Sequence, residues 1–134
     1  MKAERMLIDE YQAAVRRVVS TLRAGFGRDD LLRARRTGVI PKDGVISGIE
    51  FSFHGIGCRA IVDDVEVDFD FGLDGRADGF DAWRLWLFAR QKPKKYPQFQ
   101  RQEDIKAALE RLARSGEIEI PQTESSGYLW YLKS

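Results

Sequence analysis

The N-terminal segment of the chain has the hydrophobic pattern of one amphipathic helix. Apolar side chains recur in it at steps of three and four residues, at Leu7, Tyr11, Val15, Val18 and Leu22. This spacing places them on one side of an α-helix. The glycines of AGFG predict that the helix ends near Gly25. A short second helix is predicted over residues 28–38, with acids near its start and arginines near its end.

The pattern changes at Gly44 to an alternation of apolar and polar residues, which is typical of β-strands. The sequence VISGIEFSFH predicts a first strand, CRAIVDD a second and VEVDFDF a third. The third strand is predicted to turn its apolar side chains toward the core, and Glu66, Asp68 and Asp70 away from it. The short connections GIG and DD favour an antiparallel meander of these three strands.

The remaining sequence predicts two helices, a linker between them and two final strands. The helices are DGFDAWRLWLFARQ and QEDIKAALERLARSG, and the linker KPKKYPQFQ is basic and broken by proline. The tryptophans are predicted to be core residues. EIEIP and GYLWYLK are predicted to form a C-terminal hairpin. Residues 1–134 are therefore expected to form a single α+β domain, whose antiparallel sheet (a three-stranded central meander plus the C-terminal hairpin) packs against about four helices.

Composition and charge narrow the class of protein. The 134 residues have a net charge of +1, but residues 43–81 carry −8, between flanks of +5 and +4. An acidic surface repels nucleic acid and attracts a basic protein. The single cysteine excludes an internal disulfide, and the charged N-terminus MKAERMLIDEYQ lacks the apolar segment of a signal peptide. No apolar run is long enough to cross a membrane, so a cytoplasmic protein is expected.

The segment HGIGC holds the only histidine of the chain, His54, and the only cysteine, Cys58. The two glycines between them allow a tight turn, so a hairpin with a buried cysteine is one interpretation. A Cys–His pair with a nucleophilic thiolate is a second. A zinc site is a third, although zinc needs four ligands and this segment offers two. The sequence favours the hairpin and leaves the other two interpretations open.

A second segment, DFDFGLDGRADGFD, has part of the pattern of a calcium-binding loop. In a twelve-residue loop, Asp70, Asp74, Asp78 and Asp81 take positions one, five, nine and twelve, with Gly75 at the sharp turn. Position three, however, is a glycine, and the preceding element is a strand rather than a helix. The favoured interpretation is a turn at Asp74, followed by a helix with Asp78 as its N-cap and Asp81 in its first turn. The alternative is a calcium or zinc site formed by His54, Cys58, Asp70, Asp74 and Asp81.

The acids of this central block are the predicted partner-binding residues. Those on one face of a strand lie about 6.5–7 Å apart. At that distance they repel one another unless water, a cation or a basic group compensates them, and Arg59 or Arg84 could supply the basic group. The predicted partner-binding set is Asp63, Asp64, Glu66, Asp68, Asp70, Asp74 and Asp78. No catalytic residue is assigned.

The motifs FHGIGC, VDFDFG and GFDAWRLWLFA together resemble an uncharacterised bacterial family, a domain of unknown function. The resemblance covers most of residues 44–90 and, more loosely, the C-terminal helix and hairpin, and it implies no established activity. Small α+β proteins of this kind are often immunity proteins of polymorphic toxin or contact-dependent inhibition systems. This association by type and the acidic central block together lead us to expect a cytoplasmic immunity protein that neutralises a cognate toxin, such as a basic nuclease, through its acidic surface. The competing expectation is a metal-binding protein, or small metal-dependent hydrolase, that uses His54, Cys58 and nearby aspartates.

Overall fold

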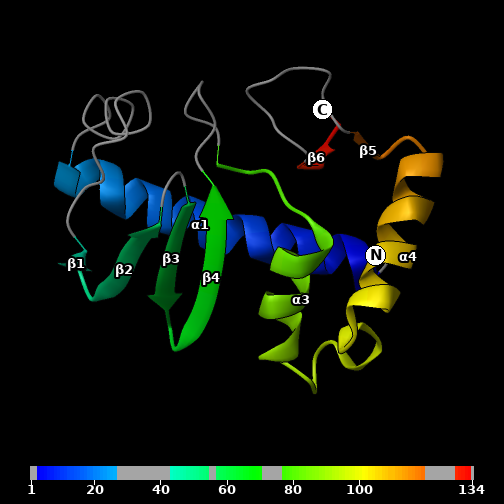
Figure 1. Cartoon of the computed structure of the whole chain (residues 1–134), viewed down its shortest axis with the longest axis horizontal. Helices are drawn as coiled ribbons and strands as arrows, with labels where there is room; N and C mark the ends of the chain where they lie inside the picture. The colour runs from blue at the N-terminus through cyan, green and yellow to red at the C-terminus, as the bar shows by residue number, and fades with distance from the viewer. Residues whose placement is uncertain (1–2, 27–42, 55–56, 71–76, 120–128, 134) are drawn as a thin grey trace.

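A long N-terminal helix crosses behind an antiparallel sheet in this protein (Figure 1). The structure, a computed structural model, describes residues 3–26, 43–54, 57–70, 77–119 and 129–133. The helix is α1 (Ala3–Phe26), and the predicted end near Gly25 is confirmed. Further helices lie beside the last strand of the sheet, so the chain has the mixed α+β architecture that its sequence predicts.

The sheet has four strands, each paired with the next in the sequence. They are β1 (Gly44–Ile46), β2 (Ile49–His54), β3 (Gly57–Val62) and β4 (Val65–Asp70). The expectation of three strands is wrong, because the first predicted strand folds back on itself at Ser47 and Gly48. Both residues have a positive φ, 52° and 81°, which a two-residue hairpin turn requires. Before the turn there are only three strand residues, Gly44–Ile46, too few to show a period of their own, so the sequence pattern does not separate β1 from β2.

The core lies between α1 and the inner face of the sheet. The five residues of the predicted helical face are all buried: Leu7, Tyr11, Val15, Val18 and Leu22. They belong to one hydrophobic cluster with the inward side chains of the strands, among them Phe51, Val67 and Phe69. The predicted apolar faces of both elements are therefore confirmed. The opposite face of the sheet, here called the outer face, has no helix from the described residues over it (Figure 1).

Three α-helices lie in the described residues, against about four expected. The second and third of them are α3 (Ala82–Arg90) and α4 (Gln102–Arg114). α3 packs against β4, α1 and α4. The short helix predicted over residues 28–38 lies outside the described residues. No helix in this part of the chain has the length and apolar composition that a membrane span needs.

The C-terminal part of the chain packs onto α3 and α4. The linker between these helices contains a short 3₁₀-helix, η1 (Pro97–Phe99), and buries Tyr96 and Phe99. After α4, β5 (Ile118–Glu119) and β6 (Tyr131–Leu132) pair antiparallel, which confirms the predicted C-terminal strand pair. The linker is therefore part of the packed structure rather than a spacer.

Side chains, not a further strand, close the free edge of β4. Gln91, directly after α3, uses its amide as a backbone would: Oε1 accepts a hydrogen bond from Glu66 N and Nε2 donates one to Glu66 O, both at 2.8 Å. The Tyr11 hydroxyl of α1 donates to the backbone oxygen of Asp68 at 2.6 Å. Open strand edges pair with other chains. These bonds therefore dock α1 and α3 onto β4 and also protect its edge.

Replacing Gln91 with alanine is expected to lower the free energy of unfolding by about 1–3 kcal/mol, because both backbone groups of Glu66 lose their partner. Gln98→Ala, at an exposed position of η1, is the matched control. Urea denaturation of the two variants measures the difference. Equal stabilities would contradict the edge-closing role of Gln91.

Candidate functional site

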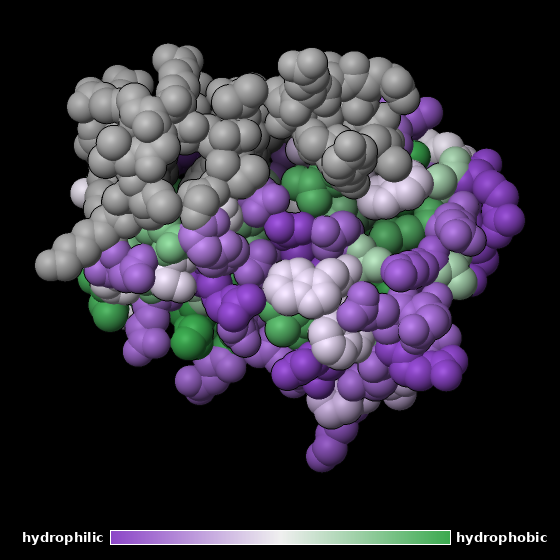
Figure 2. All heavy atoms as spheres, in the orientation of Figure 1, coloured by the Kyte–Doolittle hydropathy of each residue, from purple (hydrophilic) through white to green (hydrophobic). Residues whose placement is uncertain are grey.

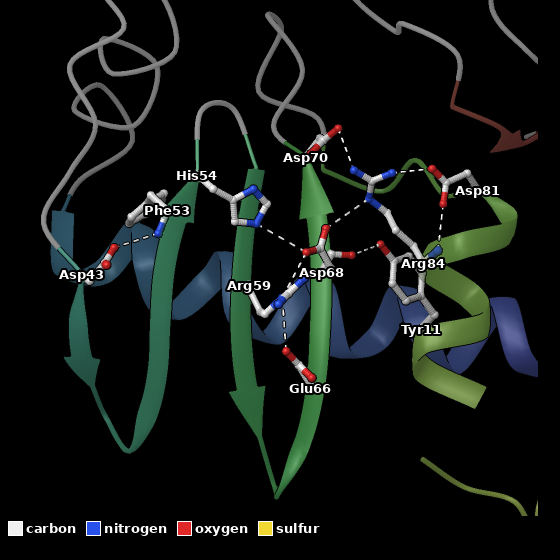
Figure 3. Close-up of polar contacts among 10 residues, drawn as sticks. All are labelled: Tyr11, Asp43, Phe53, His54, Arg59, Glu66, Asp68, Asp70, Asp81 and Arg84. Atoms are coloured by element: carbon white, nitrogen blue, oxygen red, sulfur yellow. Dashed lines mark hydrogen bonds and ion pairs between the residues drawn. The ribbon is translucent and has the colours of Figure 1, made fainter. Parts of the chain in front are cut away.

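The outer face of the sheet gathers polar side chains from three strands (Figure 3). In the strand register, Arg59 lies directly opposite Asp68, and Gly57 lies between His54 and Asp70. Paired residues of an antiparallel sheet point to the same face. The register therefore brings one histidine, one arginine and two aspartates together on the side away from α1.

Asp68 is the buried centre of this cluster, with a relative exposure of only 2%. Its carboxylate is therefore shielded from solvent. Three basic side chains close over its carboxylate: Arg84 Nε lies 3.4 Å from Oδ1, and Arg59 Nε and His54 Nε2 each lie 3.4 Å from Oδ2. The long side chains of neighbouring elements thus replace water around this acid. Pairing with Arg59 and Arg84 was the other outcome that the sequence allowed.

Arg84 is the cation around which the aspartates gather (Figure 3). Its guanidinium pairs with Asp68 through Nε at 3.4 Å, with Asp70 through Nη2 at 3.0 Å, and with Asp81 through Nη1 at 2.5 Å. We call Arg84 and these three aspartates the arginine cage. The cage joins the end of β4 to the first turn of α3, because it takes two acids from the strand and the arginine from the helix.

The start of α3 explains how Arg84 is aimed at the strand. Asp81 is the N-cap of the helix, and its Oδ1 accepts a hydrogen bond from the backbone N of Arg84 at 2.8 Å. The prediction that Asp78 is the N-cap, with Asp81 inside the first turn, is wrong. The reason is a backbone bridge between Phe80 and Trp130, with N–O distances of 3.0 and 2.8 Å, which delays the helix to Ala82.

Burial and charge act in opposite directions on the two central groups of the cage. Burial raises the pKa of Asp68, and the attraction of Arg84 and the other basic side chains does not cancel this effect. For Arg84, burial acts to lower the pKa, but the carboxylates, Asp81 first, outweigh it and the pKa is raised. Asp68 Oδ1 and Arg84 Nε face each other without forming a hydrogen bond to any described residue. Arg84 therefore stays charged, while the charge on Asp68 is costly.

His54 and Cys58 point to opposite faces of the sheet, so the Cys–His pair, which the sequence left open as an alternative, does not form. Cys58 lies opposite Phe53, is fully buried on the inner face, and has its pKa raised by burial to about 12. A thiol with this pKa is protonated and unreactive at neutral pH. His54 is half-exposed on the outer face and leans over Gly57, where a β-carbon would lie 2.6 Å from its Cε1. Gly57 therefore leaves the space that the imidazole needs.

The acids predicted to bind a partner fall into separate environments. Asp63 and Asp64 form the turn from β3 to β4, with positive φ values of 50° and 64°. Asp63 also pairs with Arg17 of α1. Glu66 pairs with Arg59, with Nε and Oε1 3.2 Å apart. The side chains of these three acids lie at or near the surface, in contrast to those of the cage.

The other predicted site residues are divided between the cage and the loops. Asp70 and Asp81 pair with Arg84, so a guanidinium occupies the place that a bound cation would take in the alternative interpretation. Asp78 is partly buried, and its backbone oxygen accepts a hydrogen bond from Gln12 at 2.8 Å. Asp74 lies outside the described residues. Among those that are described, no three histidine, cysteine or acidic side chains come together as a metal-ligand group.

The outer face places Glu66, a predicted partner-binding residue, beside residues that sequence reasoning missed. Val45, Glu50, Ile61 and Glu66 are aligned in one row across the four strands. Val45 is 64% exposed and Ile61 41% exposed, and Trp83 of α3, predicted to be a core residue, is 37% exposed. Alternation along β2 and β3 places Glu50 and Ile61 outward, which is the signal that could have found them. The row therefore mixes acidic and apolar side chains on one exposed surface.

The comparisons with known proteins now place the chain in a family. The model of a domain of unknown function, DUF6896, matches residues 5–132, and the chain belongs to this family. No curated protein and no solved structure matches the chain at a significant level. The resemblance inferred from the central motifs is confirmed, and it extends over nearly the whole chain.

The Asp68→Asn variant isolates the cost of the buried charge. Because the pKa of Asp68 is raised, the folded state binds a proton there more readily than the unfolded chain does. Ionisation of Asp68 therefore lowers the stability of the wild type as the pH rises, while asparagine does not ionise. The stability of Asp68→Asn relative to the wild type is expected to increase from about pH 3 to about pH 6. Urea denaturation at each pH measures it.

The matched control for this experiment is Asp9→Asn, which removes one carboxylate from the partly exposed Arg5–Asp9 pair of α1. A relative stability of Asp68→Asn that instead falls as the pH rises would contradict the expected sign. That result would mean that the ion pairs of Asp68 outweigh its burial.

Proposed function

We propose that this protein is a non-enzymatic binding protein that takes a basic protein partner on the outer face of its sheet. The observation that supports this proposal is the one-sided cover of the sheet: α1 covers the inner face, and no described helix covers the outer one (Figure 1). Figure 2 views the molecule from the outer side and shows hydrophilic side chains interleaved with hydrophobic ones. Mixed surfaces of this kind are typical of protein interfaces.

The charge of the outer face favours a basic partner. Among the described residues, five acidic side chains lie on it or at its border with α3, against two arginines. The acids are Glu50, Glu66, Asp68, Asp70 and Asp81, and the arginines are Arg59 and Arg84. Counted without His54, these described side chains carry a net charge of −3. Complementary charge speeds association and disfavours partners of the same sign.

The acids of this face differ in what they can offer a partner. Asp68 is buried within the arginine cage, whereas Glu50 is exposed and Glu66 is partly exposed. Glu50 and Glu66 flank Ile61 in the register, so their strands are about 10 Å apart. An exposed apolar side chain thus lies between two accessible carboxylates. We take this row as the centre of the proposed interface.

The specific form of the proposal is an immunity protein that neutralises a cognate toxin, such as a basic nuclease. A toxin must be captured quickly, and electrostatic steering raises the association rate of oppositely charged proteins. The hydrolase alternative depends on His54 and Cys58 acting together. Their placement on opposite faces of the sheet supports a binding role instead.

A first experiment identifies the partner. A photo-crosslinking amino acid at Ile61 is expected to capture a basic protein in cells, because this position is exposed at the centre of the row. The same amino acid at Ala107, an exposed position on α4, is the control. Equal capture from both positions would contradict an interface on the outer face.

A second experiment tests the role of charge with the captured partner. The double variant Glu50→Lys/Glu66→Lys is expected to bind about tenfold more weakly at low salt, mainly through slower association, and the difference should shrink as salt is added. Glu110→Lys, an exposed reversal on α4, is the matched control. Unchanged affinity and unchanged salt dependence in the double variant would rule the face out.

A further inference from the structure

Trp83 is exposed, unlike the other two tryptophans of the chain. Trp86 is partly buried, and its indole N–H donates to the backbone oxygen of Gln100 at 3.0 Å. Trp130 is partly buried and bridged to Phe80. An exposed tryptophan keeps a large apolar surface in water, and such residues are frequent at the centres of protein interfaces. Trp83 is therefore a candidate contact residue for the partner, and the direction in which its side chain points becomes important.

Helix geometry shows which way Trp83 points. Phe88 of α3 packs edge-on against Tyr11 of α1, with ring centroids 6.0 Å apart, so this side of α3 faces α1. At 3.6 residues per turn, Trp83 lies about 140° around the helix from Phe88. Arg84, between these two directions, reaches over to β4. Trp83 therefore points away from α1, to the same side as the outer face of the sheet.

Trp83 and the arginine cage both lie at the start of α3. Trp83 lies in the sequence between Asp81 and Arg84, and the carboxylates of Asp70 and Asp81 are both partly exposed. The cage has three carboxylates for one guanidinium, so it keeps two negative charges. An indole face beside a net negative charge attracts a planar cation through both cation–π and charge-assisted hydrogen bonds.

We propose that Trp83, with Asp81 and Asp70, binds an arginine side chain of the partner. Arginine fits better than lysine, because its guanidinium stacks on an indole and can bind a carboxylate through two parallel hydrogen bonds. The same helix already shows such a stack, since the guanidinium carbon of Arg90 lies 5.0 Å from the ring centroid of Trp86. This inference rests on the proposed function, because it names the partner side chain that the acidic outer face receives.

The test uses the intact protein and a short arginine-rich peptide, acetyl-(Gly-Arg)3-amide, at low salt. The indole N–H signal of Trp83, assigned by its loss in Trp83→Phe, is expected to shift on titration, and to shift less with the equivalent lysine peptide. Trp83→Ala is expected to bind the arginine peptide about two- to fivefold more weakly than the wild type. Trp83→Leu, which keeps an apolar side chain on α3, should be weakened equally. Glu110→Lys is expected to bind as the wild type does.

An unmoved Trp83 signal, or undiminished peptide binding by Trp83→Ala and Trp83→Leu, overturns the inference. Binding measurements with the captured partner distinguish a failure of this inference from a failure of the proposed function. If Glu50→Lys/Glu66→Lys weakens partner binding and Trp83→Ala does not, the acidic face stands and the arginine site at Trp83 fails. If neither weakens it, both fail.

Discussion

The positive charge of the Arg84 guanidinium holds the end of β4 and the start of α3 together. It pairs with two aspartates of β4 and with the aspartate that caps α3. Without a cation at this point, three carboxylates would face one another at the junction of strand and helix, one of them almost wholly buried. Removing one partner of a buried ion pair is far more costly than never having formed the pair. The cage therefore fixes how α3 meets the sheet, in addition to the edge contacts of Gln91 and Tyr11.

The cage also divides the acids of the chain by role. Asp68 is fully engaged in holding the fold, and its raised pKa reflects what its burial costs. Glu50 and Glu66 lie at the surface, beside Ile61, where a partner can reach them. The −8 charge of the central block is thus partly structural and partly available for binding. A count of acids in the sequence does not separate these two roles, whereas the position of each acid around Arg84 does.

Local periodicity made much of the fold predictable. The buried face of α1, the alternation in β4 and the helix over residues 102–114 follow directly from the spacing of apolar residues. The turn at Ser47 and Gly48 was not predictable in this way, because β1 is only three residues long and shows no alternation of its own. The register between β2 and β3 also rules out the Cys–His pair. Once His54 lies opposite Gly57, Cys58 falls on the other face.

The candidate site depended on contacts between distant parts of the sequence. Alternation shows that Asp68 leaves β4 on the outer side, but it does not show what covers it. The cover comes from Arg84, whose helix begins at Ala82 because Phe80 is held by Trp130, fifty residues further along the chain. Trp83 is exposed for the same reason, since the start of the helix sets the direction of each of its side chains. Such contacts leave no periodic signal in a single sequence.

The most direct test of the role of Arg84 is a double-mutant cycle with Arg84→Met and Asp68→Asn, followed by urea denaturation. Arg84→Met alone is predicted to lower the free energy of unfolding by about 3–5 kcal/mol, because it leaves a buried carboxylate without its cation. Adding Asp68→Asn should restore part of this loss, so that the two changes depart from additivity by more than about 1 kcal/mol. Additive effects, or a small effect of Arg84→Met alone, would contradict the conclusion that Arg84 holds this face of the protein together.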